Sequence, residues 1–463
     1  MQQFEQHQFI TTARLTILLV ALLLCLLFGQ QMHAADADSI EQDEQSNVER
    51  SQRYSEQKAL FDQQIATLET EVGPFDNALA EPLQSLTALH IEAGDFTEAD
   101  SVLKRRLQLS RFVDGPEGLE QIEILEELIA NNIRRSQWQD VTENFENIQL
   151  IRTQNPNTAI SIVLDAMSTT RNWYLTAIYV DDPILRIDYY HSARELQRQM
   201  LRLAEERYSE DSPELIPWLY SNALQKYQTA TFITSRDELG ADARDQISRP
   251  LAKSPVNFLR EGLDMAKRIR SIVETQNDLE AEAMSMIYEA DYQMLLQLGT
   301  ARRLYRRAMD KLEEAGIDPQ RITEFFERPI VLPEPIFYTS IDEAIDAQTA
   351  YGYTVTPADD GEQIHMGEYI AWNESLPYAR RPQIPDEASS IATELYVVEV
   401  EFNISSQGEV RTPDAQWADP DVVRVRRDAQ DAIEDMQFRP RFYDGRWRRV
   451  RDVTMRYLYP PKL

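Results

Sequence analysis

The feature that most constrains the fold is a pair of helical apolar stripes that recurs along the chain. The first stripe ends at a turn, Gly94-Asp95-Phe96, and a second stripe follows it. The same arrangement returns 42 residues later around Ser136-Gln137-Trp138. Since a helix pair of this kind cannot bury its apolar face alone, the recurrence predicts an all-α solenoid of stacked helix pairs over residues 57–316. The apolar positions of the two copies are Leu83, Leu86, Leu89, Ala99, Leu103, Leu107, Leu125, Leu128, Val141 and Phe145.

A polar stretch at residues 205–214 joins two later helical stripes and reads Glu-Glu-Arg-Tyr-Ser-Glu-Asp-Ser-Pro-Glu. It resembles the linker between repeats in tetratricopeptide (TPR) proteins of the kinesin-light-chain type. The helical stripes predict about five such repeats, the last three irregular, and the interruption of the period at residues 232–254 predicts an insertion or a long loop. The concave face of such a solenoid would bind a protein ligand, and the alternative is a spacer whose stripes are only core.

The last part of the chain, residues 390–463, follows a different pattern. Val398, Val400, Phe402 and Ile404 alternate with polar residues, which predicts a strand with one buried face. A turn at Gly408, a second strand, an apolar helical spacing and a final alternation up to Tyr459 come next. The order strand, strand, helix, strand (β-β-α-β) predicts a small α+β domain.

This ordered set resembles the C-terminal domain of the TonB family. The resemblance implies a part in TonB-dependent transport across the outer membrane, or in envelope protein contacts generally. It also implies that the closing strand, residues 451–459, lies at the sheet edge, where an extended peptide of an envelope protein or outer-membrane receptor adds as a further strand. The matching residues are Val398, Phe402, Gly408, Val410, Ala429, Ala432, Phe438, Pro440, Asp444, Gly445, Val450 and Tyr457.

Arginines crowd this closing strand, although the whole chain has a formal net charge of −31. Three interpretations stay open: charged protection of a strand edge, a recognition surface for an acidic peptide, or docking against the acidic helical part of the same chain. Trp447 is either an anchor in such a contact or a turn residue that lies on the sheet. The predicted peptide-binding residues are Arg439, Arg441, Arg446, Arg448, Arg449, Arg451, Val453, Met455 and Tyr457.

Between the two patterned regions, residues 317–389 contain eight prolines. Helical periodicity fades there, apart from one short helix expected at residues 340–349. The segment predicts a partly extended connector between two independently folded parts.

The chain begins with a leader-like segment. Arg14 precedes an apolar run, Leu15 to Phe28, that is shorter than the roughly 20 residues of a spanning helix. Small residues follow between Ala34 and Ala37, so residues 1–34 predict a cleaved signal peptide and a periplasmic protein of a Gram-negative bacterium. The alternative is a retained leader that anchors the chain in the inner membrane. The only cysteine, Cys25, lies in this run, so the mature chain is expected to have no disulfide.

Composition and motifs restrict the function classes. The strong acidity argues against nucleic acid and anionic membrane surfaces as partners. No phosphate-binding loop, zinc-protease pattern or nucleophile elbow occurs, and His90, His191 and His365 lie in unrelated segments. The sequence therefore predicts a non-enzymatic periplasmic adaptor without cofactor or metal, which binds envelope proteins through both parts. The alternative is a true TonB-type energy transducer with an uncleaved N-terminal helix.

Overall fold

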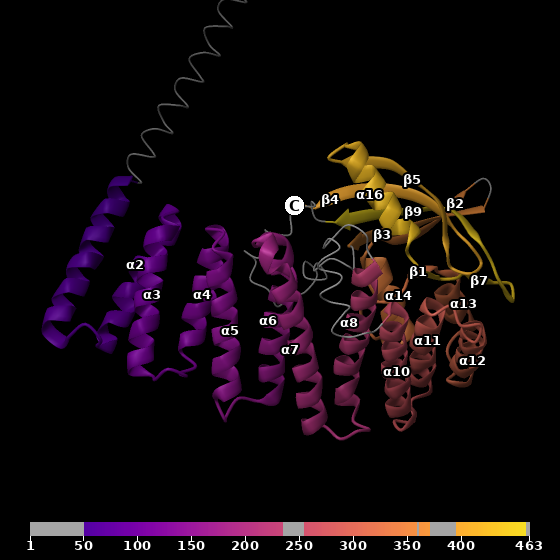
Figure 1. The fold of residues 1–463 in the computed structure, drawn as a ribbon, viewed down its shortest axis with the longest axis horizontal. Coiled ribbons are helices and arrows are strands. Elements are labelled where there is room, and N and C mark those ends of the chain that lie inside the picture. The colour runs from indigo at the N-terminus through magenta and orange to yellow at the C-terminus, as the bar shows by residue number, and fades with distance from the viewer. Residues whose placement is uncertain (1–50, 235–253, 359–360, 371–394, 460–463) are drawn as a thin grey trace, which may run out of the picture. The chain divides into compact units, whose positions relative to one another are not determined.

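The computed structural model describes residues 51–234, 254–358, 361–370 and 395–459 (Figure 1). The predicted leader and most of the predicted insertion lie outside these ranges. By the contacts within it, the chain divides into two compact units, residues 1–116 and 117–463. Among the helices in the described ranges, none is both long and apolar enough to cross a membrane.

The first unit is a small helical bundle. Residues 51–72 are helical, and a 3-10 turn, η1 (Asn77–Leu79), leads into α2 (Ala80–Ala93) and α3 (Phe96–Val113). Gly94 ends α2 in the left-handed conformation with φ of 76°, and the side chain of Asp95 accepts a hydrogen bond from the Glu98 amide at the start of α3. The helix–turn–helix predicted from the first pair of stripes is confirmed. Its core is formed by Ile65, Leu79, Leu83, Leu86, Leu89 and Leu109.

The second unit begins with a succession of helices, each of which packs against the next one along the chain. Ser136, the counterpart of Gly94 in the recurring pattern, is also left-handed, with φ of 54°. The mostly helical array predicted from the recurring stripes is therefore present. The helices are α4 (Gln121–Arg134), α5 (Trp138–Gln154), α6 (Ile160–Val180), α7 (Arg186–Arg207), α8 (Ile216–Thr234), α10 (Pro255–Glu274), α11 (Leu279–Leu295) and α12 (Ala301–Glu314), with the short 3-10 helices η2 (Pro183–Leu185) and η3 (Pro213–Leu215) between them.

Helix α11 is enclosed on every side. Each residue from Ala283 to Met294 is buried, as expected for a helix without a solvent face. Helices α10 and α12 pack on it, and the Tyr288 hydroxyl donates a hydrogen bond to the carbonyl of Ile336, 2.9 Å away. The segment that follows the helical array is thus part of the same core.

That segment corrects the predicted connector. Residues 317–370 form folded elements: α13 (Pro319–Glu327), β1 (Ile330–Val331), α14 (Ile341–Ala350), β2 (Tyr353–Ala358) and β3 (Gly361–Ile370). The short helix expected at residues 340–349 is α14. The prolines in the described part of this segment sit at the start of α13, between elements and in the edge strand β2, where they interrupt no buried ladder; Pro377, Pro382 and Pro385 lie outside the described residues. A domain boundary at residue 390 is therefore wrong, because β2 and β3 belong to the C-terminal sheet.

The main sheet has five strands in the order β2-β3-β9-β4-β5. Helix α16 (Val423–Glu434) covers one face, and Val425, Ala429 and Ile433 pack there on the alternating residues of the strands. The predicted order strand, strand, helix, strand is present, with short extra strands between the helix and the last strand. The strands are β4 (Tyr396–Ile404), β5 (Val410–Asp419), β6 (Phe438–Arg439), β7 (Phe442–Tyr443), β8 (Arg446–Trp447) and β9 (Val450–Tyr459).

The closing strand β9 is not an edge strand, contrary to the sequence prediction. It pairs antiparallel with β4 on one side and parallel with β3 on the other, where Ile364 lies opposite Val453 and Tyr369 opposite Tyr457. The chain's own β3 occupies the side where the added peptide was expected. The true edges of this sheet are β2 and β5.

Candidate functional site

Arg439, the first of the predicted binding residues, is buried and links the sheet to the helical array. Its side chain is 1% exposed. Its Nε and one terminal nitrogen donate to the two carboxylate oxygens of Asp291 on α11, at 3.0 and 2.6 Å, and that nitrogen also lies 3.2 Å from Glu334. The guanidinium stacks 5.0 Å from the ring centroid of Phe325. Of the three interpretations of the arginines, internal docking therefore applies to this residue.

The cluster holds one cation and two carboxylates. The Tyr305 hydroxyl donates a 2.6 Å hydrogen bond to Asp291. Burial raises the pKa of Glu334, and Asp291 adds to the rise, while Arg439 opposes it. Burial likewise raises the pKa of Tyr305, so this hydroxyl remains a donor. The arrangement is a buried clamp between two parts of the core, in which Arg439 is the cationic partner of both carboxylates.

Arg441 is also engaged within the chain. Its guanidinium lies 3.2 Å from Glu327 on α13 and 2.5 Å from Glu362 on β3, and it stacks 5.1 Å from the ring of Tyr443. Trp447 packs on Tyr305 and on Phe442, with ring centroids 5.7 and 4.8 Å apart. Of its two predicted roles, Trp447 fills that of an anchor, in a contact within the chain, because it rests on α12 and does not lie on the main sheet.

The remaining predicted residues separate into two groups. Val453, Met455 and Tyr457 are at most 2% exposed and pack in the core beneath α16. Because their side chains point into the core of the sheet, they do not reach past an edge. Four arginines of the predicted set are exposed: Arg446, Arg448, Arg449 and Arg451.

The β5 edge of the sheet is closed by its own neighbours. Arg426 on α16 donates to the carbonyl of Ala415 at 2.9 Å, and Gln430 donates to the carbonyl of Pro413 at 3.1 Å. Thr412 is left-handed, with φ of 52°, and the register with β4 is irregular at two places. Bulges, proline and occupied carbonyls are ways in which an edge strand avoids further pairing.

The β2 edge is open by comparison. Thr354, Val355, Thr356 and Pro357 are all exposed, and Val355 retains 44% of its accessible surface. Val355 lies opposite the buried Ile364 of β3. An edge of this kind offers backbone donors and acceptors to an extended segment.

A groove of about 330 Å³ runs beside this edge, between α13 and the β2–β3 hairpin. Val355 and Ile364 give it an apolar side, and Gln320 and Thr323 of α13 give it an exposed polar rim. The other lining residues are Glu324, Glu327, Arg328, Glu362 and Arg441. A groove with an apolar side, a polar rim and charged residues around it suits the side chain of a bound peptide.

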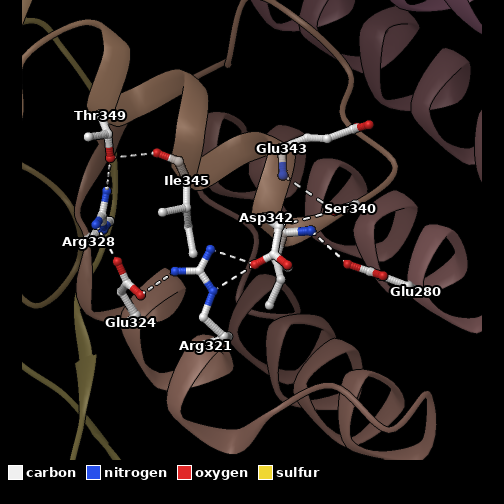
Figure 2. Close-up of polar contacts among 10 residues, drawn as sticks. Glu280, Arg321, Glu324, Arg328, Ser340, Asp342, Glu343, Ile345 and Thr349 are labelled. Atoms are coloured by element: carbon white, nitrogen blue, oxygen red, sulfur yellow. Dashed lines mark hydrogen bonds and ion pairs between the residues drawn. The ribbon is translucent and has the colours of Figure 1, made fainter.

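The α13 wall of the groove is held in place by a network of ion pairs and hydrogen bonds (Figure 2). Arg321 donates to Asp342 at the start of α14, 2.7 Å away, and to Glu324, 2.6 Å away. Arg328 pairs with Glu324, donates to Thr349 at 3.3 Å, and stacks 5.0 Å from the ring of Tyr353. Ser340 caps α14 by accepting hydrogen bonds from its first amides.

The start and the orientation of α13 follow from its sequence. Asp318 caps α13, and Pro319 occupies its first turn. Ile322, Phe325 and Phe326 then face the core, which leaves Gln320 and Thr323 on the outer side. The helix therefore presents a polar face to the groove.

The groove was missed from sequence, although one signal was present. Residues 353–356 read Tyr-Thr-Val-Thr, a β-branched run, and Asp359-Asp360-Gly361 follow as a turn signal. Together they predict a hairpin. The prolines of the segment favoured a connector instead.

No group of three or more His, Cys, Asp or Glu side chains in the described ranges could hold a metal ion. His90 is 1% exposed, its Nδ1 lies 3.0 Å from the Tyr54 hydroxyl, and burial lowers its pKa. His365 accepts a hydrogen bond from the Gly367 amide within β3, 3.0 Å away.

Comparison with known proteins gives structural neighbours only. No protein-family model matches the chain, and no curated protein matches it. Among solved structures, the nearly identical TPR-like repeats of a Podosopora anserina kinesin light chain are 13% identical, cover 48% of this chain and 89% of their own, and give a TM-score of 0.29. BtubC (BKLC) from P. vanneervenii is 14% identical, covers 58% of this chain and 90% of its own, and gives a TM-score of 0.25. At these scores the similarity assigns no function.

Proposed function

We propose that this chain is a non-enzymatic adaptor that binds an extended segment of a partner protein along the β2 edge. The observation that carries the proposal is the difference between the two sheet edges. Side chains of α16 occupy carbonyls of β5, whereas four consecutive residues of β2 are exposed beside a groove of about 330 Å³. Backbone pairing would supply affinity, and the groove would select a side chain.

The location proposed for this adaptor is the periplasm. The short apolar run from Leu15 to Phe28 and the small residues after it support export. N-terminal sequencing of the protein purified from the envelope should find a mature start between Ala35 and Asp38. An intact N-terminus in the inner membrane would instead favour the energy-transducer alternative.

We also propose a link to TonB-dependent transport or to other envelope contacts. The strand, strand, helix, strand order of β4, β5, α16 and β9 supports it. Binding would take place at β2 rather than at the closing strand, since β3 pairs with that strand. The helical array would serve as the scaffold and as a second protein-binding surface.

The test uses peptides selected against the full-length chain from a random peptide library. Binding of a selected peptide is measured by fluorescence anisotropy, and its location by hydrogen exchange of the β2 amides. Thr323→Trp should fill the groove and weaken binding by about tenfold or more. Thr153→Trp on α5, another exposed helical threonine, is the matched control and should bind as wild type.

Two results would overturn this function. One is a selected peptide whose affinity is unchanged by Thr323→Trp. The other is binding that protects amides elsewhere and leaves those of β2 unchanged.

A further inference from the structure

The four exposed arginines of the predicted set do not stand alone on the folded chain. Helix α12 carries four more in its first two turns: Arg302, Arg303, Arg306 and Arg307. The first group ends at Arg307 and the second begins at Arg446, so no local sequence pattern joins them.

Contacts around Trp447 bring the two groups together. The Trp447 ring lies 5.7 Å from that of Tyr305 on α12, and the Arg302 guanidinium lies 5.9 Å from the Trp447 ring centroid. Arg302 also donates a 2.6 Å hydrogen bond to the carbonyl of Ser406 in the turn between β4 and β5. The β7–β8 hairpin and α12 lie at the same end of the second unit (Figure 1). We call the area around this contact the α12–β8 surface, after the two elements that meet at Trp447. The arginines of these elements and of the residues next to them are Arg302, Arg303, Arg306, Arg307, Arg446, Arg448, Arg449 and Arg451.

Few of these charges are neutralised. Within the part of the chain that the structure describes, Arg448 pairs with Asp444, 3.7 Å away. No ion pair to a described residue involves the other seven arginines, and six of those seven are exposed. The carboxylates of α12 itself are Asp310, one turn beyond Arg306 and Arg307, and Glu313 and Glu314 at its end. A cationic area therefore remains on a chain of net charge −31.

The placement of the α12 arginines is unfavourable for the helix itself. Its N-terminal end carries partial positive charge from the aligned peptide dipoles, so cations there are destabilising and acidic residues would be preferred. The first turn of α12 has no acidic residue, and no side chain caps it. Residues that disfavour the local structure in which they lie are typical of functional positions.

The limited size of the α12–β8 surface favours a short anionic partner over a long one. Charges are screened over about 8 Å at physiological ionic strength, so the surface attracts an anion that stays within its bounds. A long polyanion such as nucleic acid, or an extended anionic membrane, would reach the acidic remainder of the chain and be repelled. Guanidinium groups bind carboxylates with paired hydrogen bonds.

We propose that the α12–β8 surface binds a short segment of a partner protein rich in aspartate and glutamate. This site is separate from the β2 groove and does not depend on it. Both arginine groups contribute, so the site exists only when the sheet is folded against α12.

The experiment measures binding of a fluorescein-labelled peptide of about twelve residues, alternating glutamate and serine, to the full-length chain. Arg303→Glu with Arg307→Glu, and separately Arg446→Glu with Arg449→Glu, should each raise the Kd by about tenfold or more. The control variant reverses Arg202 and Arg424, which are 66% and 75% exposed on α7 and α16, and should bind as wild type. The Kd should also rise steeply with salt.

Three outcomes would overturn the proposal. The first is wild-type binding by either pair of variants, since the two groups would then not form one site. The second is tighter binding to a single-stranded oligonucleotide of equal charge, or to vesicles containing anionic lipid, than to the peptide. The third is salt-sensitive self-association of the chain that the same variants abolish while peptide binding is absent. Circular dichroism of each variant confirms that loss of binding does not reflect unfolding.

Discussion

Arg439 and Arg449 lie in one short arginine-rich run, yet their surroundings are opposite. Arg439 is 1% exposed and is held by Asp291 and Glu334, whereas Arg449 is exposed and pairs with no described carboxylate. The partner carboxylate on α11 is 148 residues away along the chain. The difference shows that a run of like charges can contain both a core clamp and a surface site, and that distant residues decide which is which.

Replacement of Arg439 should give the largest difference between the two regions. Arg439→Met leaves two carboxylates buried without their cation, which should lower the free energy of unfolding by about 3–5 kcal/mol. Arg449→Met should change it by less than about 0.5 kcal/mol. Urea unfolding of the full-length proteins, followed by circular dichroism, measures both.

A triple variant tests whether the lost ion pairs cause the destabilisation by Arg439→Met. Adding Asp291→Asn and Glu334→Gln to Arg439→Met removes the stranded charges and should recover part of the loss. If the triple variant is less stable than Arg439→Met alone, the ion pairs are not what makes Arg439 important.

Trp447 lies at the boundary between the two regions, and its loss should have an intermediate effect. Trp447→Ala removes the contacts with Tyr305 and Phe442 and should cost about 2 kcal/mol, less than a fully buried tryptophan. Trp417→Ala on β5, where the side chain is 46% exposed, is the control and should be nearly neutral. Equal losses in both variants would contradict the docking of Trp447 on α12.

The buried region should also differ in its response to pH. Burial raises the folded-state pKa of Glu334 above its usual value of 4.5. The folded chain therefore keeps this proton after the unfolded chain has lost it, and stability from this group falls as pH rises through the folded pKa. Glu334→Gln should remove that loss, so its stability relative to wild type should increase from pH 4.5 upward. Thermal melts across this range test it, and a constant difference at every pH would contradict it.

The smallest expected effect belongs to the exposed arginines. Arg446→Glu with Arg449→Glu should alter the free energy of unfolding by about 0.5 kcal/mol or less, because exposed charges contribute little to stability. A loss comparable with that of Arg439→Met would mean that these arginines are structural, and the comparison between the two regions would fail.

Local periodicity was sufficient to predict several elements. The stripes around Leu83 and Leu125 predicted helix pairs, and the alternation from Val398 to Ile404 predicted β4, because each pattern reflects one buried face. The order of β4, β5, α16 and β9 followed from the same reasoning.

What depends on distant pairing could not be read from sequence. The run Tyr353 to Thr356 had strand-forming residues, but Pro357 favoured a connector; the proline is tolerated because β2 is an edge strand. The position of β9 between β3 and β4 is set by parallel pairing, which leaves no turn signature. The groove between α13 and β2 also depends on distant pairing, so the sequence did not predict it. The arginine-rich run was recognised from sequence, but Arg439 and Arg441 are engaged within the chain and do not form a peptide-binding edge.

The enclosure of α11 has a consequence for how the chain is made. Synthesis proceeds from the N-terminus at about 5–20 residues per second, so about 7–30 seconds separate Asp291 from Arg439, 148 residues later. During this interval the carboxylate of Asp291 on α11 lacks the arginine that pairs with it in the folded chain. The long sequence separation of the closing contacts also slows folding once synthesis is complete. A chain released before Arg439 is made would therefore keep the Asp291 carboxylate of α11 without its cation.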